Sequence, residues 1–286
     1  MLWQLYDELI LDLDGVVYIG ANAVPHAVNS LNALQDQGVL LTAATNNASR
    51  PTDVVHKHLT TLGLNILASN ILSSAQAAAS LMKQSAEPGA TILAVGGDGV
   101  EECLRTEGFH VLRAVNTLES NNVIADEVVG VVQGHGVDSG WWDFCTAMWA
   151  ITRGAVWIAT NRDSTVPLEF GLGPGNGTFV EALSRVSGKV PLVAGKPEPT
   201  LFQEVQRRTQ AHRPLVIGDR LDTDIDAALA AGMDSVLVLT GVHGIDDVRS
   251  RSENLRPTYI CRDLRELLEK NPDSLRSEAV LAEYKE

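Results

Sequence analysis

Apolar and polar positions along this chain form two alternating kinds of segment. Short runs rich in apolar residues, typical of buried strands, occur at residues 9–13, 39–44, 91–95, 128–132, 155–159, 192–194, 215–217 and 236–239. Helical patterns separate them, the first two at residues 24–37 and 52–62, the latter starting after Pro51. This alternation predicts an α/β fold with a Rossmann-like, mostly parallel sheet.

Four short polar motifs lie at the carboxyl ends of predicted strands. They are Asp12-Leu13-Asp14-Gly15-Val16, Thr45-Asn46-Asn47, Gly195-Lys196-Pro197 and Gly218-Asp219-Arg220-Leu221-Asp222-Thr223-Asp224. Taken singly, each is commonly a turn or the start of a helix. In a parallel sheet, however, loops open at the carboxyl ends of the strands, and functional groups gather there. The shared position of the four motifs therefore predicts that their side chains converge.

The first motif offers the chemistry of phosphoryl transfer. A carboxylate at a strand end, here Asp12, can attack phosphorus and form an acyl phosphate. Asp14, two residues further on, can protonate the leaving oxygen and then activate water. Gly15 permits the sharp turn that such a site needs.

The second and third motifs suit the binding of a phosphate group. The hydroxyl of Thr45 and the loop amides of Asn46 and Asn47 can hold phosphate oxygens. The ammonium of Lys196 can balance the charges of Asp12 and of the phosphoryl group.

The fourth motif places acids immediately after a strand. Asp219 and Asp224 can supply the oxygen ligands that suit Mg²⁺. A helix N-terminus also favours acids, so this motif by itself leaves both explanations open. Its combination with the other three favours a joint metal and phosphate site.

The motifs also divide the chain. The first two end by residue 47 and the last two begin at residue 195, whereas the stretch between them alternates strands and helices without any such motif. We expect an inserted α/β cap domain over residues 83–190, entered at residues 85–89 and left at residues 187–191. Residues 1–82 and 191–286 would form the catalytic core.

Composition and charge narrow the range of partners. The formal net charge of −14 provides no basic surplus for nucleic acid or an anionic membrane, so neither is expected as a partner. The N-terminus lacks a basic segment, and no stretch approaches 18 uncharged apolar residues, so we expect neither a secretory signal nor a membrane span. Cys103, Cys145 and Cys261 are scattered and odd in number, which favours free thiols in a reducing cytoplasm.

The four motifs in this order resemble those of the haloacid dehalogenase superfamily of phosphatases. More narrowly, the chain is similar to the group related to the NagD nucleotidase and 4-nitrophenyl phosphatases, whose large α/β cap lies between the second and third motifs. Within this group it looks most similar to actinobacterial glycerol 3-phosphate phosphatases. Matching stretches include Ala159-Thr160-Asn161-Arg162-Asp163, Gly173-Pro174-Gly175-Asn176-Gly177, Val131-Val132-Gln133-Gly134 and Leu239-Thr240-Gly241-Val242.

The resemblance implies a Mg²⁺-dependent phosphomonoesterase that acts on a small phosphorylated metabolite, glycerol 3-phosphate, through an aspartyl phosphate. Asp12 would be the nucleophile and Asp14 the acid and base, with Asp224 as a supporting acid. The metal ligands would be Asp12, the backbone carbonyl of Asp14, and Asp219. The groups that hold phosphate would be Thr45, Asn46, Asn47 and Lys196. A homodimer through the cap is a further expectation from the family.

Three alternatives stay open. The substrate could be a sugar phosphate or a nucleotide. A phosphomutase would use the same aspartyl phosphate, although such enzymes usually carry a smaller helical cap inserted earlier. A non-catalytic phospholigand-binding protein would not need Asp12, Asp14, Lys196 and Asp219 to be intact.

The loop at residues 161–177 is the expected source of substrate selectivity. Loops of this charged, proline- and glycine-rich kind often deliver side chains over a rigid site. We expect Arg162, Asp163 and Glu169 to contact the organic part of the substrate. Val166 stands where relatives acting on pyridoxal phosphate carry histidine, which disfavours a vitamin B6 substrate.

Overall fold

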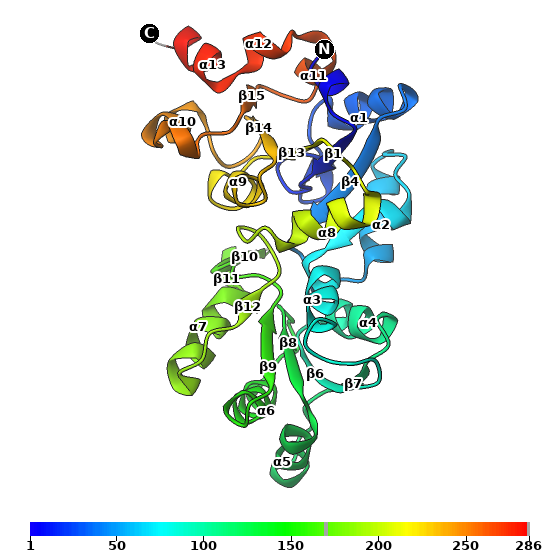
Figure 1. Ribbon diagram of the computed structural model, residues 1–286, viewed down its shortest axis with the longest axis vertical. Coiled ribbons are helices and arrows are strands. Elements are labelled where there is room, and N and C mark those ends of the chain that lie inside the picture. The colour runs from blue at the N-terminus through cyan, green and yellow to red at the C-terminus, as the bar shows by residue number, and fades with distance from the viewer. Residues whose placement is uncertain (169–170, 285–286) are drawn as a thin grey trace. The chain divides into compact units, whose positions relative to one another are not determined.

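The computed structural model describes residues 1–168 and 171–284, and their packing divides the chain into two compact units (Figure 1). The first unit comprises Met1–Thr45, Asp53–Leu72 and Lys196–Glu286, and the second comprises Asn46–Thr52 and Ser73–Gly195. Each unit has its own parallel sheet flanked by helices, so the predicted α/β fold is confirmed.

A six-stranded sheet forms the centre of the first unit. In spatial order its strands are β15 (Tyr259–Cys261), β14 (Asp234–Val238), β13 (Pro214–Gly218), β1 (Glu8–Leu11), β4 (Leu40–Thr45) and β5 (Ile71–Ser73). A separate hairpin consists of β2 (Tyr18–Ile19) and β3 (Asn22–Ala23). The helices are α1 (Ala27–Asp36), α2 (Thr52–Thr61), α8 (Thr200–Thr209), α9 (Asp226–Ala230), α10 (Ile245–Ser250), α11 (Arg265–Glu269), α12 (Pro272–Leu275) and α13 (Ser277–Glu283).

Both faces of this sheet are buried, which explains why its strands are almost continuously apolar. Leu9 and Leu11 of β1 belong to one core cluster with Leu31 of α1. On the other side of the sheet, Leu237 of β14 packs in a cluster with Val248 of α10. Side chains alternate between the two faces along a strand. Strand β14 accordingly contributes Val236 and Val238 to the first cluster and Leu237 to the second.

The second unit is built around a five-stranded parallel sheet. In spatial order its strands are β12 (Leu192–Val193), β9 (Val156–Ala159), β8 (Gly130–Gln133), β6 (Thr91–Val95) and β7 (His110–Leu112). Its helices are α3 (Ser74–Met82), α4 (Asp98–Thr106), α5 (Leu118–Glu127), α6 (Trp141–Thr152) and α7 (Asn176–Ser187). A hairpin of β10 (Thr165–Leu168) and β11 (Gly171–Pro174) precedes α7. Helices α5, α6 and α7 share one apolar core with the sheet.

The packing places the boundary of the second unit earlier than residue 83. Helix α3, which the sequence predicts to lie in the catalytic core, packs against α4, β8 and β9. Its buried face is a series of alanines ending in Met82, and such small residues allow close approach to the sheet. The segment Asn46–Thr52 also belongs to this unit. Neither feature changes the hydrophobic pattern, which is why the sequence alone did not locate this boundary.

Each helix in the described parts of the chain is too short or too polar to cross a lipid bilayer.

Glu8, at the start of β1, is a buried acid in the core of the first unit. It is fully buried, and it accepts hydrogen bonds from Thr42 Oγ1 (2.5 Å) and Thr209 Oγ1 (2.8 Å). Burial raises the pKa of Glu8, and the two hydroxyl groups only partly oppose this effect.

A raised pKa in the folded state means that the wild type loses stability as the pH rises through that pKa. The substitution Glu8→Gln removes this titration while keeping the shape. We therefore expect the variant to gain stability relative to the wild type as the pH rises. The difference between their free energies of unfolding, variant minus wild type, should increase from pH 4.5 to pH 7.5. Urea titrations at both pH values measure this difference, and a constant or falling difference would contradict the prediction.

Candidate active site

Asp12 and Asp219 lie at the ends of neighbouring strands. β1 and β13 are parallel, with Leu11 opposite Ile217, and the backbone N–H of Asp12 donates to the Ile217 carbonyl at 2.8 Å. The chain continues from β1 to β4 on one side and returns later to β13 on the other. Such a change of direction leaves a crevice beyond the carboxyl ends of the strands, where open α/β sheets bind ligands.

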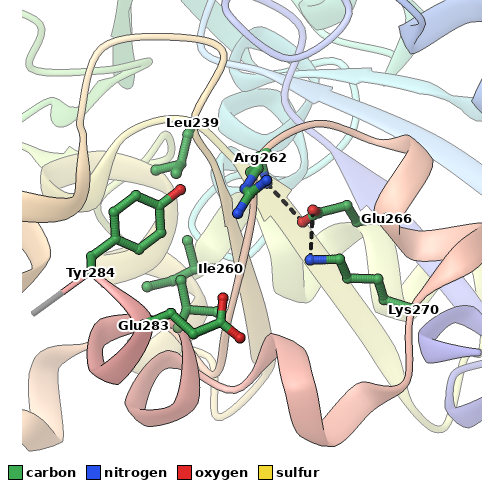
Figure 2. Close-up of a pocket in the computed structure, with 8 residues that line it drawn as sticks. Leu239, Ile260, Arg262, Glu266, Lys270, Glu283 and Tyr284 are labelled. Atoms are coloured by element: carbon green, nitrogen blue, oxygen red, sulfur yellow. Dashed lines mark hydrogen bonds and ion pairs between the residues drawn. The ribbon is translucent and has the colours of Figure 1, made fainter.

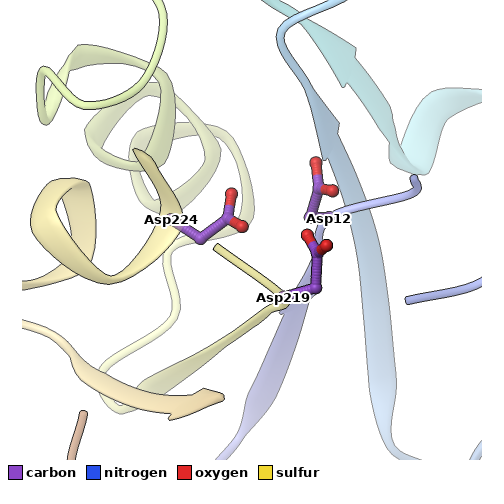
Figure 3. Close-up of side chains that lie close together, drawn as sticks. All are labelled: Asp12, Asp219 and Asp224. Carbon is purple, nitrogen blue, oxygen red and sulfur yellow. The ribbon is translucent and has the colours of Figure 1, made fainter. Parts of the chain in front are cut away.

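Three carboxylates converge at this point (Figure 3). Asp12, Asp219 and Asp224 each offer an oxygen, and these oxygens lie within 4.8 Å of one another. The residues are only 9%, 2% and 1% exposed. Because buried carboxylates are costly unless they are paired, this arrangement needs positive charge nearby.

Lys196 supplies part of that charge. Its Nζ donates to Asp12 Oδ1 at 2.5 Å and to Asp224 Oδ1 at 2.7 Å. Burial opposes the charged form of this lysine, but the two carboxylates outweigh burial and raise its pKa well above the usual range. Lys196 is therefore a permanently charged ammonium in contact with the predicted nucleophile.

The remaining charge of the cluster is negative. Three ionised carboxylates and one ammonium sum to a formal charge of −2. Accordingly, burial and the neighbouring Asp224 carboxylate raise the pKa of Asp12 to about 8 and that of Asp219 to about 6. A hard divalent cation would offset this charge with the ligand type that it prefers, so the donor set fits Mg²⁺.

Both carboxylate oxygens of Asp224 already accept hydrogen bonds within the protein. Its Oδ1 accepts from Lys196, and its Oδ2 accepts the backbone N–H of Arg220 at 3.0 Å. This geometry suits an acid that positions the lysine, and it leaves Asp12 and Asp219 as the side chains better suited to hold a metal.

Asp219 has a closely fitted position. Its Oδ2 accepts the N–H of Val242 at 2.8 Å, and a Cβ added to Gly15 or Gly241 would overlap its carboxylate. Gly15 also has φ = +78°, which favours glycine. The sequence does not reveal a role for Gly241 or Val242, because Gly241 acts through the absence of a side chain and Val242 acts through its backbone N–H.

The substitution Gly241→Ala is expected to displace the Asp219 carboxylate and weaken Mg²⁺ binding by about tenfold or more, the usual effect of disturbing the groups that orient a ligand. Gly244→Ala is the matched control, because a Cβ there meets only Asp247 at 3.9 Å. The Mg²⁺ concentration needed for half-maximal activity measures the effect. Equal values in the two variants would contradict this role of Gly241.

Asp14 lies in the turn that follows the cluster, and it is exposed. The turn is held by a hydrogen bond from the Gly15 N–H to the Tyr18 carbonyl (2.8 Å) and by one from Thr240 Oγ1 to the Gly15 carbonyl (2.7 Å). An exposed carboxyl group on a well-held turn can exchange protons with water and ligands.

Thr45 and the two asparagines after it differ in their surroundings. Thr45 ends β4, beside β1 in the first unit, and is 3% exposed. Asn46 and Asn47 belong to the second unit, where Asn46 Nδ2 donates to Asp163 Oδ1 at 3.3 Å. Asn47 Oδ1 accepts the N–H and the hydroxyl of Ser49. The side chains of Asn46 and Asn47 thus make contacts within the protein, and the sequence alone does not reveal these contacts.

The expected selectivity loop is described only in part. Arg162 is exposed and Asp163 is half-buried. Glu169 lies outside the described residues, so its expected contact with substrate stays a prediction.

A small cavity near the C-terminus is a poor candidate for a substrate site (Figure 2). Its walls include Arg262, Glu266, Lys270 and Tyr284, and its volume is about 10 Å³. That is about the space that one water molecule needs. Glu266 also pairs with Lys270 at 2.9 Å, so the charged side chains neutralise each other.

Comparison with known proteins agrees with this arrangement. A family model described as haloacid dehalogenase-like hydrolase matches residues 9–110, and a second, HAD-hydrolase-like model matches residues 193–267. The D-glycerol 3-phosphate phosphatase of Mycobacterium tuberculosis is 42% identical over 264 residues, which cover 92% of this chain and 71% of that protein. An acid sugar phosphatase of Staphylococcus aureus is 30% identical and covers 92% of this chain and 97% of its own length.

The fold is also found among solved structures. A glycerol phosphate phosphatase from M. tuberculosis in complex with magnesium superposes with a TM-score of 0.88 and 40% identity, over 96% of this chain and 80% of that one. The residues matched by the two family models include all four motifs and the acidic cluster at the carboxyl ends of β1 and β13. This chain is therefore an enzyme of the haloacid dehalogenase-like hydrolase family.

Proposed function

We propose that this protein is a Mg²⁺-dependent phosphomonoesterase that hydrolyses a small phosphorylated metabolite, with glycerol 3-phosphate as its substrate. The observation that carries the proposal is the buried contact between Lys196 and Asp12, at the edge of a cluster that also contains Asp219 and Asp224. A carboxylate beside a fixed ammonium and a set of metal ligands is suited to attack a phosphate ester.

Two residues carry the bond-making steps. A carboxylate oxygen of Asp12 bonds to phosphorus as the ester bond breaks, and Asp14 gives its proton to the leaving alkoxide. Asp14 then takes a proton from a water molecule whose oxygen bonds to phosphorus. The acyl phosphate bond breaks, Asp12 becomes a carboxylate again, and inorganic phosphate leaves.

The other residues of the site balance charge and position the charged groups. Lys196 stays beside Asp12 and offsets the negative charge that develops on the phosphoryl oxygens, while Asp224 holds the lysine. Asp12, Asp219 and the backbone carbonyl of Asp14 would hold Mg²⁺, which when bound neutralises charge on the phosphate.

The phosphate group itself would be held by neighbouring polar groups. The hydroxyl of Thr45 and the ammonium of Lys196 are the candidates from the first unit. Asn46 and Asn47 follow Thr45 directly in the chain. Because their side chains contact Asp163 and Ser49, we propose that their backbone amides make the phosphate contacts.

The choice of glycerol 3-phosphate rests on the mycobacterial relative, which acts on that ester and shares 42% of aligned residues. The acid sugar phosphatases, at 30% identity, support a sugar phosphate as the second candidate. We also propose that the second unit, as the cap, contacts the organic part of the substrate. A homodimer through this unit and a cytoplasmic location, which would suit three free cysteines, remain predictions.

A panel of phosphate esters tests the proposal. We expect kcat/KM for glycerol 3-phosphate to exceed that for a hexose phosphate and for a nucleoside monophosphate by about tenfold or more, because a site that hydrogen-bonds its substrate discriminates strongly. Phosphate release in the presence of Mg²⁺ is the measurement. A preference for hexose phosphates would favour the sugar phosphatase alternative. Transfer of phosphate between hydroxyl groups without its release would indicate a mutase, and phosphate binding without turnover would indicate a non-catalytic protein.

A further inference from the structure

A chain of buried amide side chains runs through the second unit. Trp157 Nε1 donates to Gln133 Oε1 at 3.2 Å, and Gln133 Nε2 donates to Asn176 Oδ1 at 3.3 Å. Asn176 Nδ2 donates in turn to the backbone carbonyl of Asn161 at 2.8 Å. Gln133, Asn176 and Asn161 are 0%, 1% and 4% exposed, so this chain lies inside the protein. We call these three residues the amide relay.

The amide relay ends on the backbone of Asn46. Asn161 Nδ2 donates to the Asn46 carbonyl at 2.9 Å, and the buried Ser74 Oγ donates to the same oxygen at 2.7 Å. Asn161 Oδ1 accepts the N–H of Asp163, whose side chain accepts from Asn46 Nδ2. Asn46 is therefore held through both its backbone and its side chain by one network.

The network also requires glycine at a catalytic motif. A Cβ added to Gly195 would lie 2.6 Å from Asn46 Oδ1 and would overlap the backbone carbonyl of Thr160. Gly195 immediately precedes Lys196, just as Asn46 immediately follows Thr45. Gly195 and Asn46, the residues of the second unit that adjoin Lys196 and Thr45 in the chain, are thus packed against each other.

This network is an unusual way to fill a core. Buried amides contribute little net stability compared with apolar side chains of similar shape, and each one left unpaired is costly. What a fully satisfied network does provide is a single fixed geometry. Within this network, the Asn46 carbonyl accepts two side-chain hydrogen bonds, which fix its direction.

We propose that the amide relay, Gln133, Asn176 and Asn161, positions the turn Thr45–Asn47 for phosphate binding. A peptide group is planar and trans, so fixing the Asn46 carbonyl also fixes the direction of the Asn47 N–H, which points the opposite way. The relay residues touch neither phosphate nor the reacting atoms, and they act through Asn46. This inference rests on the proposed function, in which the amides of this turn bind phosphate.

The substitution Asn161→Asp tests the relay with a minimal change of shape. It keeps the oxygen that accepts from Asp163 and removes the donor to the Asn46 carbonyl. Asn121→Asp is the matched control, because Asn121 is also fully buried in the second unit and loses one donor, to the Val115 carbonyl at 2.6 Å. Ser74→Ala is a milder variant that removes the other hydrogen bond to Asn46.

Three quantities are measured for each variant: kcat and KM for the ester with the highest turnover, the affinity for inorganic phosphate, and the thermal midpoint. We expect Asn161→Asp to lower kcat and weaken phosphate binding by about tenfold or more, since small displacements of binding groups have effects of this size. Ser74→Ala should do so by a smaller factor. Asn121→Asp should lower the thermal midpoint comparably and leave kcat and phosphate affinity within about twofold.

The positioning role would be overturned if Asn161→Asp, Ser74→Ala and the control had equal kcat and equal phosphate affinity, with their thermal midpoints lowered alike. The proposed function would then remain intact. A wild-type protein that binds phosphate without hydrolysing esters would overturn the proposed enzyme, and the phosphate affinities would still decide the role of the relay. A wild-type protein that neither binds phosphate nor hydrolyses esters would overturn both.

Discussion

Replacing Asp12 with asparagine is expected to abolish turnover while the protein stays folded. An amide oxygen is a far weaker nucleophile than a carboxylate, and loss of a nucleophile typically costs several orders of magnitude in kcat. The change is nearly isosteric, and the remaining oxygen can still accept from Lys196. Initial rates of phosphate release measure the effect. Retention of more than about 1% of wild-type activity would count against covalent catalysis by Asp12.

The stability of the same variant provides the control for folding. Burial raises the pKa of Asp12 to about 8, so the metal-free wild type loses stability as Asp12 ionises with rising pH. Asp12→Asn does not titrate. In metal-free buffer, its free energy of unfolding should match or exceed that of the wild type, by a margin that grows from pH 6 to pH 8. A variant that unfolds more easily over this whole range would contradict the charge balance described for the cluster.

Removal of divalent metal is expected to have an effect of similar size. Attack on phosphorus requires Asp12 to be ionised. Without a metal, the three carboxylates and Lys196 then carry a formal charge of −2, which would repel a phosphate ester dianion. Dialysis against EDTA should therefore lower activity by about a thousandfold or more, and added Mg²⁺ should restore it. Full activity in chelator, with metal absent by elemental analysis, would contradict the proposed site.

The variant Asp219→Asn separates loss of the metal from other effects of the chelator. It removes the charge of one proposed metal ligand and keeps the oxygen that accepts from Val242. We expect activity to require a much higher Mg²⁺ concentration than in the wild type. An unchanged Mg²⁺ requirement would mean that Asp219 is not a ligand.

The sequence predicted the parts of the fold that depend on long apolar runs. Strand β6 has the predicted bounds of residues 91–95, because both faces of its sheet are buried and its residues are therefore continuously apolar. The short strands β5 and β15, of three residues each, were not predicted. Three residues show no periodicity, and their pairing with β4 and β14 is set by tertiary packing.

The same contrast holds for the candidate site. Asp12 and Asp219 could be found from the sequence, because each follows a strand and parallel strands bring such positions together. Gly241 could not, since its contribution is the space it leaves beside Asp219. The hydrogen bond between Asn161 and Asn46 joins residues 115 positions apart, and no local pattern records such a contact.

Chemical trapping of the acyl phosphate tests the central claim most directly. Asp14→Ala, mixed with 4-nitrophenyl phosphate and Mg²⁺, should form the acyl phosphate, because this leaving group needs no acid, and should hydrolyse it slowly, because the base is missing. The reaction is quenched with acid and reduced with borohydride, which converts an aspartyl phosphate to homoserine, and the peptides are analysed by mass spectrometry. The proposed mechanism predicts homoserine at position 12. Release of 4-nitrophenol beyond one equivalent, with aspartate at position 12 unmodified throughout, would contradict it.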